Sequence, residues 1–161
     1  LGSFSKIMAP GLRLGWMHAH QKLLEPFWMC GLFDSGGGPN PFNAGIVSSA
    51  IKLGFQQEIL HLLKNTYRNR RDILARALTE HLPQLAFTLP RGGFFIWAGL
   101  EGGTDAERLL ERAARHDVGF QPGIRFSSTD GLNSFLRLCF AYYGDDDLEE
   151  GVARLSRAIE K

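Results

Sequence analysis

A lysine lies among hydroxyl and guanidinium groups near the start of the chain. Lys6 follows Ser3 and Ser5, precedes Arg13, and is flanked by the apolar residues 7–9. A lysine in apolar surroundings loses hydration, which lowers its pKa and makes the amine available as a nucleophile. Two hydroxyls and a guanidinium suit a phosphate dianion, which needs several donors and a fixed positive charge. A phosphate anchor beside an amine nucleophile is what a pyridoxal 5'-phosphate site requires, with the lysine as Schiff-base partner, although an exposed polar cluster is the commoner arrangement of such residues.

A second candidate is an arginine in the centre of the apolar segment 135–141. Alternation along a strand places Arg137 on one face with Phe135 and Cys139. A half-buried guanidinium needs an anionic partner. That partner is either an internal carboxylate, the commoner case, or the carboxylate of a bound substrate.

The segment around the lysine resembles a known family. Residues 3–16 read Ser-Phe-Ser-Lys-Ile-Met-Ala-Pro-Gly-Leu-Arg-Leu-Gly-Trp, and this string is similar to the cofactor-lysine segment of the fold-type I pyridoxal-phosphate aminotransferases (class I/II). The resemblance implies that Lys6 is the catalytic lysine, which bonds to the cofactor and shuttles the substrate proton. It implies three contacts to the cofactor phosphate, from Ser3, Ser5 and Arg13.

The resemblance extends over most of the chain. It implies that Arg137 binds the substrate α-carboxylate through a bidentate fork. Residues 90–100 look like the hairpin that enters the family's small domain, and residues 118–123 look like a strand and turn near the substrate entrance. The loop at residues 35–40 corresponds roughly to one that faces the partner subunit of a homodimer, but its glycines give no residue a role.

Composition and charge argue against several classes of function. The chain has 161 residues, of which 44% are hydrophobic and 22% charged, so it can bury a core. A net charge of +1 gives no reason to expect nucleic-acid binding, and the apolar runs are too short to span a membrane. Cys30 and Cys139 form no disulfide framework, which favours a reducing, cytoplasmic location. His18 and His20 have no third ligand nearby, so we expect no metal.

The predicted fold is α/β. Hydrophobic periodicity predicts a strand at 12–17, helices at 21–33, 42–55 and 57–82, and then an order of strand, strand, helix, strand, strand, helix. Thr104 with Glu107 and Asp146 with Glu149 are the expected helix caps. The resemblance implies that residues 1–58 are the C-terminal part of a large cofactor-binding domain. Residues 59–161 are a linking helix and a small α+β domain.

The expected function is transfer of an amino group between an amino acid and a 2-oxo acid. In the resembled family, further groups that hold the cofactor ring precede the lysine, and only five residues precede Lys6 here. We therefore expect a C-terminal portion of an aminotransferase that is inactive when isolated. Two alternatives remain open: a lyase or decarboxylase of the same fold, and an effector-sensing domain of a transcriptional regulator.

Overall fold

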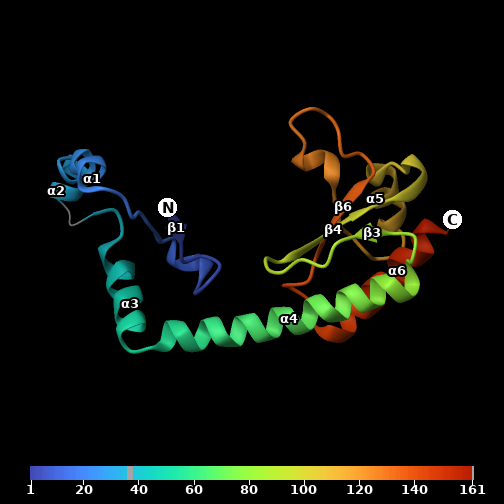
Figure 1. Cartoon of the computed structure of the whole chain (residues 1–161), viewed down its shortest axis with the longest axis horizontal. Coiled ribbons are helices and arrows are strands. Elements are labelled where there is room, and N and C mark those ends of the chain that lie inside the picture. The colour runs from blue at the N-terminus through green and yellow to red at the C-terminus, as the bar shows by residue number, and fades with distance from the viewer. Residues whose placement is uncertain (36–37, 161) are drawn as a thin grey trace. The chain divides into compact units, whose positions relative to one another are not determined.

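The chain divides into two compact units, described separately below. The computed structural model describes residues 1–35 and 38–160. The first unit is Leu1–Lys64, and the second begins at Asn65. The division falls inside α4, a helix that runs without interruption over Phe55–His81 (Figure 1). This agrees with the helix predicted at 57–82.

The first unit begins with a small hairpin. Strand β1 (Gly2–Ser3) pairs in antiparallel fashion with β2 (Gly15–Trp16), and a 3-10 turn, η1, lies between them at Pro10–Leu12. A Cβ at Gly2 would overlap the indole of Trp16, which would then have to shift. The predicted strand at 12–17 is therefore wrong in its first half. The Leu12 carbonyl is bonded by two asparagine side chains instead of a neighbouring strand.

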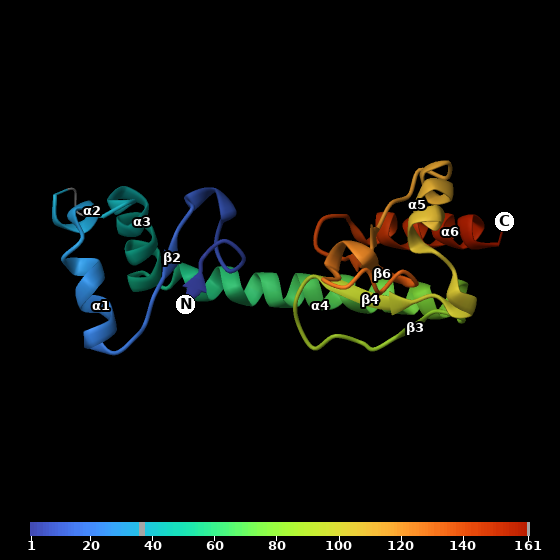
Figure 2. The same ribbon diagram turned by 90° about the horizontal axis from the view of Figure 1, so that it is seen from above.

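Three helices follow in the first unit, as Figure 2 shows. They are α1 (Gln21–Trp28), α2 (Gly31–Asp34) and α3 (Pro41–Lys52). The helix predicted at 21–33 is thus two helices. Pro26 lies in the last turn of α1, where it removes one backbone donor, and the helix ends two residues later. Part of the loop predicted at 35–40, residues 36–37, lies outside the described residues.

The second unit is built on a four-stranded antiparallel sheet with the order β3-β4-β6-β5. Its strands are β3 (Ala86–Phe87), β4 (Phe95–Gly99), β5 (Gln121–Pro122) and β6 (Phe135–Cys139). Helix α5 (Ala106–Ala114) lies between β4 and β5 in the chain, and α6 (Asp145–Ile159) ends it. This is the order of elements that the periodicity predicts. Two further 3-10 turns are η2 (Glu101–Gly103) and η3 (Gly123–Phe126).

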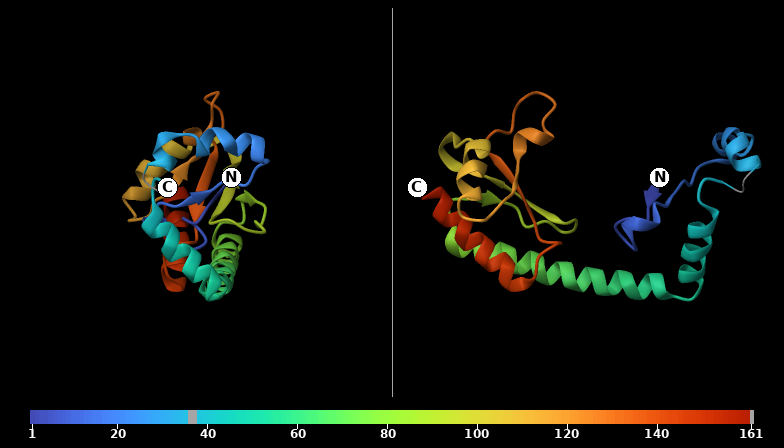
Figure 3. Two further views of the ribbon diagram at one scale, coloured as in Figure 1. Left: turned by 90° about the vertical axis from the view of Figure 1, so that its left-hand side faces the viewer. Right: turned by 180° about the vertical axis from the view of Figure 1, so that it is seen from behind.

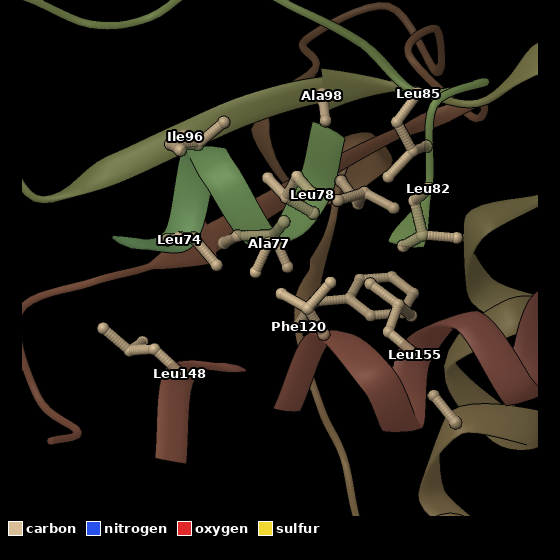
Figure 4. Close-up of a cluster of buried hydrophobic side chains, with 14 of the residues drawn as sticks. Leu74, Ala77, Leu78, Leu82, Leu85, Ile96, Ala98, Phe120, Leu148 and Leu155 are labelled. Carbon is tan, nitrogen blue, oxygen red and sulfur yellow. The ribbon is translucent and has the colours of Figure 1, made fainter. Parts of the chain in front are cut away.

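One face of this sheet is buried. Ile96 and Ala98 of β4 and Leu136 and Leu138 of β6 point into a cluster with residues of α4, α5 and α6. Figure 4 shows Leu78 of α4 beneath the strands, with residues of α6 on the far side of the cluster. Side chains that alternate with the buried ones point away from this core. The sheet therefore has a second face that the helices leave uncovered.

Helices α4 and α6 run side by side (Figures 1 and 3). The Arg76 guanidinium donates to Glu149 at 2.7 Å, and the Ser156 hydroxyl donates to the His81 carbonyl oxygen at 3.2 Å. No described helix is both long enough and apolar enough to cross a membrane.

The predicted helix caps are both displaced. Asp105, not Thr104, caps α5, and its carboxylate accepts from Glu107 N at 2.8 Å. A short polar side chain satisfies the first backbone donors best from the residue immediately before the helix. At α6 the cap is Gly144, whose N–H donates to the Asp147 carboxylate at 3.4 Å.

Candidate active site

The residues around Lys6 form a loop that is closed at its base. Ser3 lies opposite Gly15 in the β1–β2 ladder, and Phe4 N donates to the Leu14 carbonyl oxygen at 3.1 Å. Arg13 lies just before the returning strand. The structure thus places four of the predicted site residues on one loop: Ser3, Ser5, Lys6 and Arg13.

Lys6 lies at the outer turn of this loop and is exposed. The Phe4 carbonyl oxygen accepts from Ile7 N at 3.3 Å and from Met8 N at 2.9 Å, so the chain turns around residues 5–6. A side chain at the outside of such a turn is not covered by its own neighbours. The expected burial of the amine by the adjacent apolar residues is therefore wrong within this chain.

Arg13 adopts a left-handed backbone conformation, with φ 49° and ψ 46°. Its guanidinium Nη1 donates to the Pro10 carbonyl oxygen at 3.2 Å, and the residue is exposed. On the other side of the loop, the Ser3 hydroxyl accepts from Ser5 N at 3.1 Å. Because that hydroxyl accepts here, its own hydrogen stays available to a ligand.

Two asparagines that sequence reasoning missed support the Arg13 side of the loop. Asn40 Nδ2 donates to the Leu12 carbonyl oxygen at 2.9 Å, and Asn43 Nδ2 donates to the same oxygen at 3.0 Å. A weaker contact of 3.4 Å joins Asn40 to the Arg13 carbonyl oxygen. The local signal was an asparagine between two prolines, followed by a second asparagine at the start of a helix. That pattern indicates a helix start, and it does not identify the distant carbonyl group.

A cavity of about 890 Å³ adjoins this part of the first unit. Arg13 and Asn40 contribute its polar lining, and Trp16, Phe27 and Trp28 contribute aromatic rings. The first unit therefore has a cavity with aromatic walls beside Arg13.

Arg137 lies on the uncovered face of the sheet in the second unit, as the alternation predicted. Its neighbours in register are Trp97 on β4 and Gln121 on β5. The side chain is half-buried, and its Nε atom is buried with no hydrogen-bond partner among the described residues. No described carboxylate pairs with it. The sequence left open an ion pair between Arg137 and an internal carboxylate. That ion pair is not formed in the described part of the chain.

Aromatic rings surround this guanidinium. Arg137 Cζ lies 4.0 Å from the centroid of the Phe95 ring and 4.2 Å from that of the Phe126 ring. Trp97 stacks on Phe135, with centroids 5.7 Å apart and an interplanar angle of 18°. A cation held among rings and without a carboxylate partner is suited to bind an external anion.

A cavity of about 470 Å³ opens beside Arg137, with Gln121 and Tyr143 in its lining. Glu150 and Arg154 also line it. A hydrogen bond of 2.8 Å from Arg154 Nε holds the pKa of the Glu150 carboxyl below its usual value, and the carboxylate raises the pKa of Arg154 in turn. These two charges satisfy each other, so Arg137 is the lining cation that has no acidic partner among the described residues.

Both polar sites lie in a stretch of sequence that is shared with known proteins. The sequence profile of the family "Aminotransferase class I and II" matches residues 1–155. The chain belongs to this family. The loop at Lys6 and the face at Arg137 both fall within the part of the chain that matches the family.

Individual aminotransferases agree with this assignment. Aromatic-amino-acid aminotransferase 1 from Thermococcus litoralis is 32% identical, over 100% of this chain and 39% of its own length. The crystal structure of α-aminoadipate aminotransferase from Thermus thermophilus, complexed with N-(5'-phosphopyridoxyl)-L-leucine, is 33% identical with a TM-score of 0.85. That match covers 99% of this chain and 41% of the other. The chain thus spans about two fifths of the length of the relatives it matches.

Regulators also occur among the relatives of this chain. The HTH-type transcriptional regulator TauR from Rhodobacter capsulatus is 28% identical, over 99% of this chain and 33% of its own length.

Proposed function

We propose that this chain supplies the C-terminal part of a pyridoxal-phosphate-dependent aminotransferase, which transfers an amino group between an amino acid and a 2-oxo acid. The observation that carries the proposal is the closed loop of residues 1–16. It presents an amine, hydroxyls and a guanidinium together in a chain of this family.

The donor set of the loop fits the cofactor in part. The hydroxyls of Ser3 and Ser5 and the Arg13 guanidinium are the donors that a phosphate dianion needs, and Lys6 supplies the amine for its aldehyde. Arg13 donates one hydrogen bond to Pro10, and its other N–H groups remain for a ligand. Groups to hold the aromatic ring are not assigned in this chain. The residues therefore fit the phosphate and the aldehyde of the cofactor and leave the ring to other parts of the protein.

Within this proposal each residue has a defined task. When bound, pyridoxal phosphate supplies an electron sink that stabilises the substrate carbon after it loses its proton. Lys6 Nζ takes that proton from the substrate Cα and gives it up again in a later step of the same reaction. Arg137 orients the substrate by its carboxylate, because two N–H groups in one plane fix the direction of the Cα–H bond.

The domain assignment is part of the same proposal. Residues 1–58 form the end of the large domain, and residues 59–161 form the linking helix and the small domain. Exposed apolar side chains on and next to the helices of the first unit support a further covering surface in the assembled protein, from the remaining large domain or a partner subunit. Examples are Met29 at 85%, Phe42 at 78% and Trp28 at 53% exposure. We propose a homodimer on this ground. The free cysteines Cys30 and Cys139 favour a cytoplasmic location.

The test compares the intact gene product with the 161-residue chain alone. An assay of amino-group exchange with 2-oxoglutarate should show activity in the intact protein and none in the isolated chain. Borohydride reduction followed by peptide mapping should find the phosphopyridoxyl group on Lys6. Lys6→Ala should lose both activity and label, whereas Lys22→Ala, a change at an exposed lysine of α1, should keep them. Label on other lysines alone would refute the assignment.

The regulator alternative is supported by the similarity to TauR. The exchange assay and the borohydride label together distinguish this alternative, because an effector-sensing protein would take the label on Lys6 without catalysing exchange. Release of carbon dioxide from the amino acid would instead indicate the lyase alternative.

A further inference from the structure

Two phenylalanine rings approach the Arg137 guanidinium from different sides of β6. Phe95 belongs to β4, and Phe126 ends η3, the turn that follows β5; β4 and β5 flank β6 in the sheet. Cζ lies 4.0 Å from one ring centroid and 4.2 Å from the other. The face of an aromatic ring attracts a guanidinium, because the ring quadrupole is negative there. Both rings therefore favour the same position of the cation.

We propose that Phe95 and Phe126 are positioning residues, which hold the Arg137 guanidinium ready to bind a carboxylate. The proposal rests on the proposed function of Arg137 as the carboxylate-binding residue. Neither ring needs to touch the reacting atoms, since each acts through the guanidinium.

The two rings of Phe95 and Phe126, which we call the clamp, meet a physical need of this site. An arginine side chain has several rotatable bonds, and a ligand that has to order them loses affinity. Carboxylates often fix an arginine, but no described carboxylate pairs with Arg137. The ring contacts are the interactions that remain to fix it, and unlike a carboxylate they leave the positive charge available to a ligand.

The burial of Nε determines which edge of the guanidinium is presented to a ligand. Nε is buried and has no partner among the described residues. A carboxylate therefore reaches the two terminal Nη groups and binds end-on through both of them.

The rings themselves are held in place. Phe126 meets Trp97 edge to face at 5.8 Å, and Phe95 meets Phe94 in the same way at 6.3 Å. Gly123, at the start of η3, lies so close to β6 that a Cβ there would stand 2.8 Å from Phe135 Cβ. This close approach keeps the turn that carries Phe126 against the strand that carries Arg137.

The experiment titrates the 161-residue chain, labelled with ¹⁵N-arginine, with sodium propionate and follows the Arg137 side-chain signals by NMR. We expect a saturable shift, larger at the Nη groups than at Nε. Phe95→Leu and Phe126→Leu should each weaken propionate binding by about threefold to tenfold. Phe126→Tyr, which keeps the ring, should bind within about twofold of the unaltered chain. Tyr142→Leu is the matched control, because Tyr142 is 81% exposed and its ring contacts that of Tyr143.

Two results would overturn the clamp. One is the absence of a saturable shift in the unaltered chain, and the other is equal affinity in the leucine variants, the tyrosine variant and the control. Backbone amide signals of β6 show whether each variant is folded, and Phe95→Met or Phe126→Met replaces the leucine variant at the same position if that variant is not folded. A failure of the intact protein to exchange amino groups would refute the proposed function but would leave a ring-dependent affinity standing.

Discussion

The side chain of Asn43 holds the carbonyl group of Leu12, a residue 31 positions earlier in the chain, with 3.0 Å between Nδ2 and the oxygen. Asn40 donates to the same oxygen at 2.9 Å. The next residue, Arg13, has a φ of 49°, a conformation that residues with a side chain seldom adopt. The two asparagines thus stabilise the backbone where a proposed phosphate-binding residue is placed.

Asn40→Ala and Asn43→Ala should each lower the stability of the first unit. Each change removes a hydrogen bond to the part-buried Leu12 carbonyl group, a loss of about 1 kcal/mol, and Asn40→Ala also removes the weaker bond to the Arg13 carbonyl oxygen. Urea unfolding measures the loss, and hydrogen exchange should show faster exchange at Arg13 N. Asn69→Ala is the control, because the bond from Asn69 to Asp145 is exposed and belongs to the second unit. Exchange at Arg13 that is unchanged in both variants would contradict the support we assign to these residues.

Gly123→Ala should destabilise the second unit by about 1–3 kcal/mol, the usual range for an overpacked site. The added methyl group would overlap the Leu132 carbonyl oxygen and stand 2.8 Å from Phe135 Cβ. Thermal unfolding of the variant gives the loss. At Gly119 a Cβ meets nothing within 4 Å, so Gly119→Ala should change stability by less than about 0.5 kcal/mol. Equal losses at the two glycines would disprove the close approach.

Asp105→Ala should cost about 1 kcal/mol, because the Asp105 carboxylate accepts from two backbone donors at the start of α5. Thr104→Ala should cost less, since the Thr104 hydroxyl donates to the Glu101 carbonyl oxygen in an exposed turn and to no donor of the helix. Denaturant unfolding of the two variants compares them directly. The reverse order would restore Thr104 as the cap that the sequence pattern suggested.

The interaction of Glu150 with Arg154 should depend on pH. The lowered pKa of Glu150 arises first from the Arg154 hydrogen bond. A carboxyl group with a lowered folded-state pKa stabilises the fold above its unfolded pKa of about 4.3, and that contribution disappears as pH falls through the folded value. Arg154→Gln should therefore lower stability slightly more at pH 7 than in strong acid. Titration of the Glu150 carboxyl carbon by NMR should show a higher pKa in this variant, whereas Arg76→Gln should leave it unchanged.

Hydrophobic periodicity predicted which helices and strands the second unit contains better than it predicted the residues at which they begin and end. Buried stripes such as Ile73, Leu74 and Ala77 identified α4, because burial repeats along the helix. Helix caps were wrong by one or two positions, since Thr104 and Asp105 are both capping residues and only the local backbone path decides between them. The strand at residues 12–17 was shortened by side chains from a distant helix, which no local pattern reveals.

For the candidate site, the sequence predicted the elements that carry the residues better than it predicted the surroundings of their side chains. Residue types alone grouped Lys6 with Ser3, Ser5 and Arg13, and the alternation placed Arg137 on the outer face of β6. The exposure of Lys6 was missed, because burial depends on parts of a fold that are remote in sequence. The rings over Arg137 were missed for a related reason. Phe95 and Phe126 belong to different elements that only the order of strands brings together.

Alternation along β4 and β6 has an evolutionary consequence. Ile96 and Leu136 keep the unit folded, while Trp97 and Arg137 beside them contribute nothing to that buried layer. Mutations at the outer positions leave that buried layer intact, so recognition can change there while the core is kept. A single pair of strands thereby lets descendants of one ancestral gene acquire different ligand preferences and keep the same architecture.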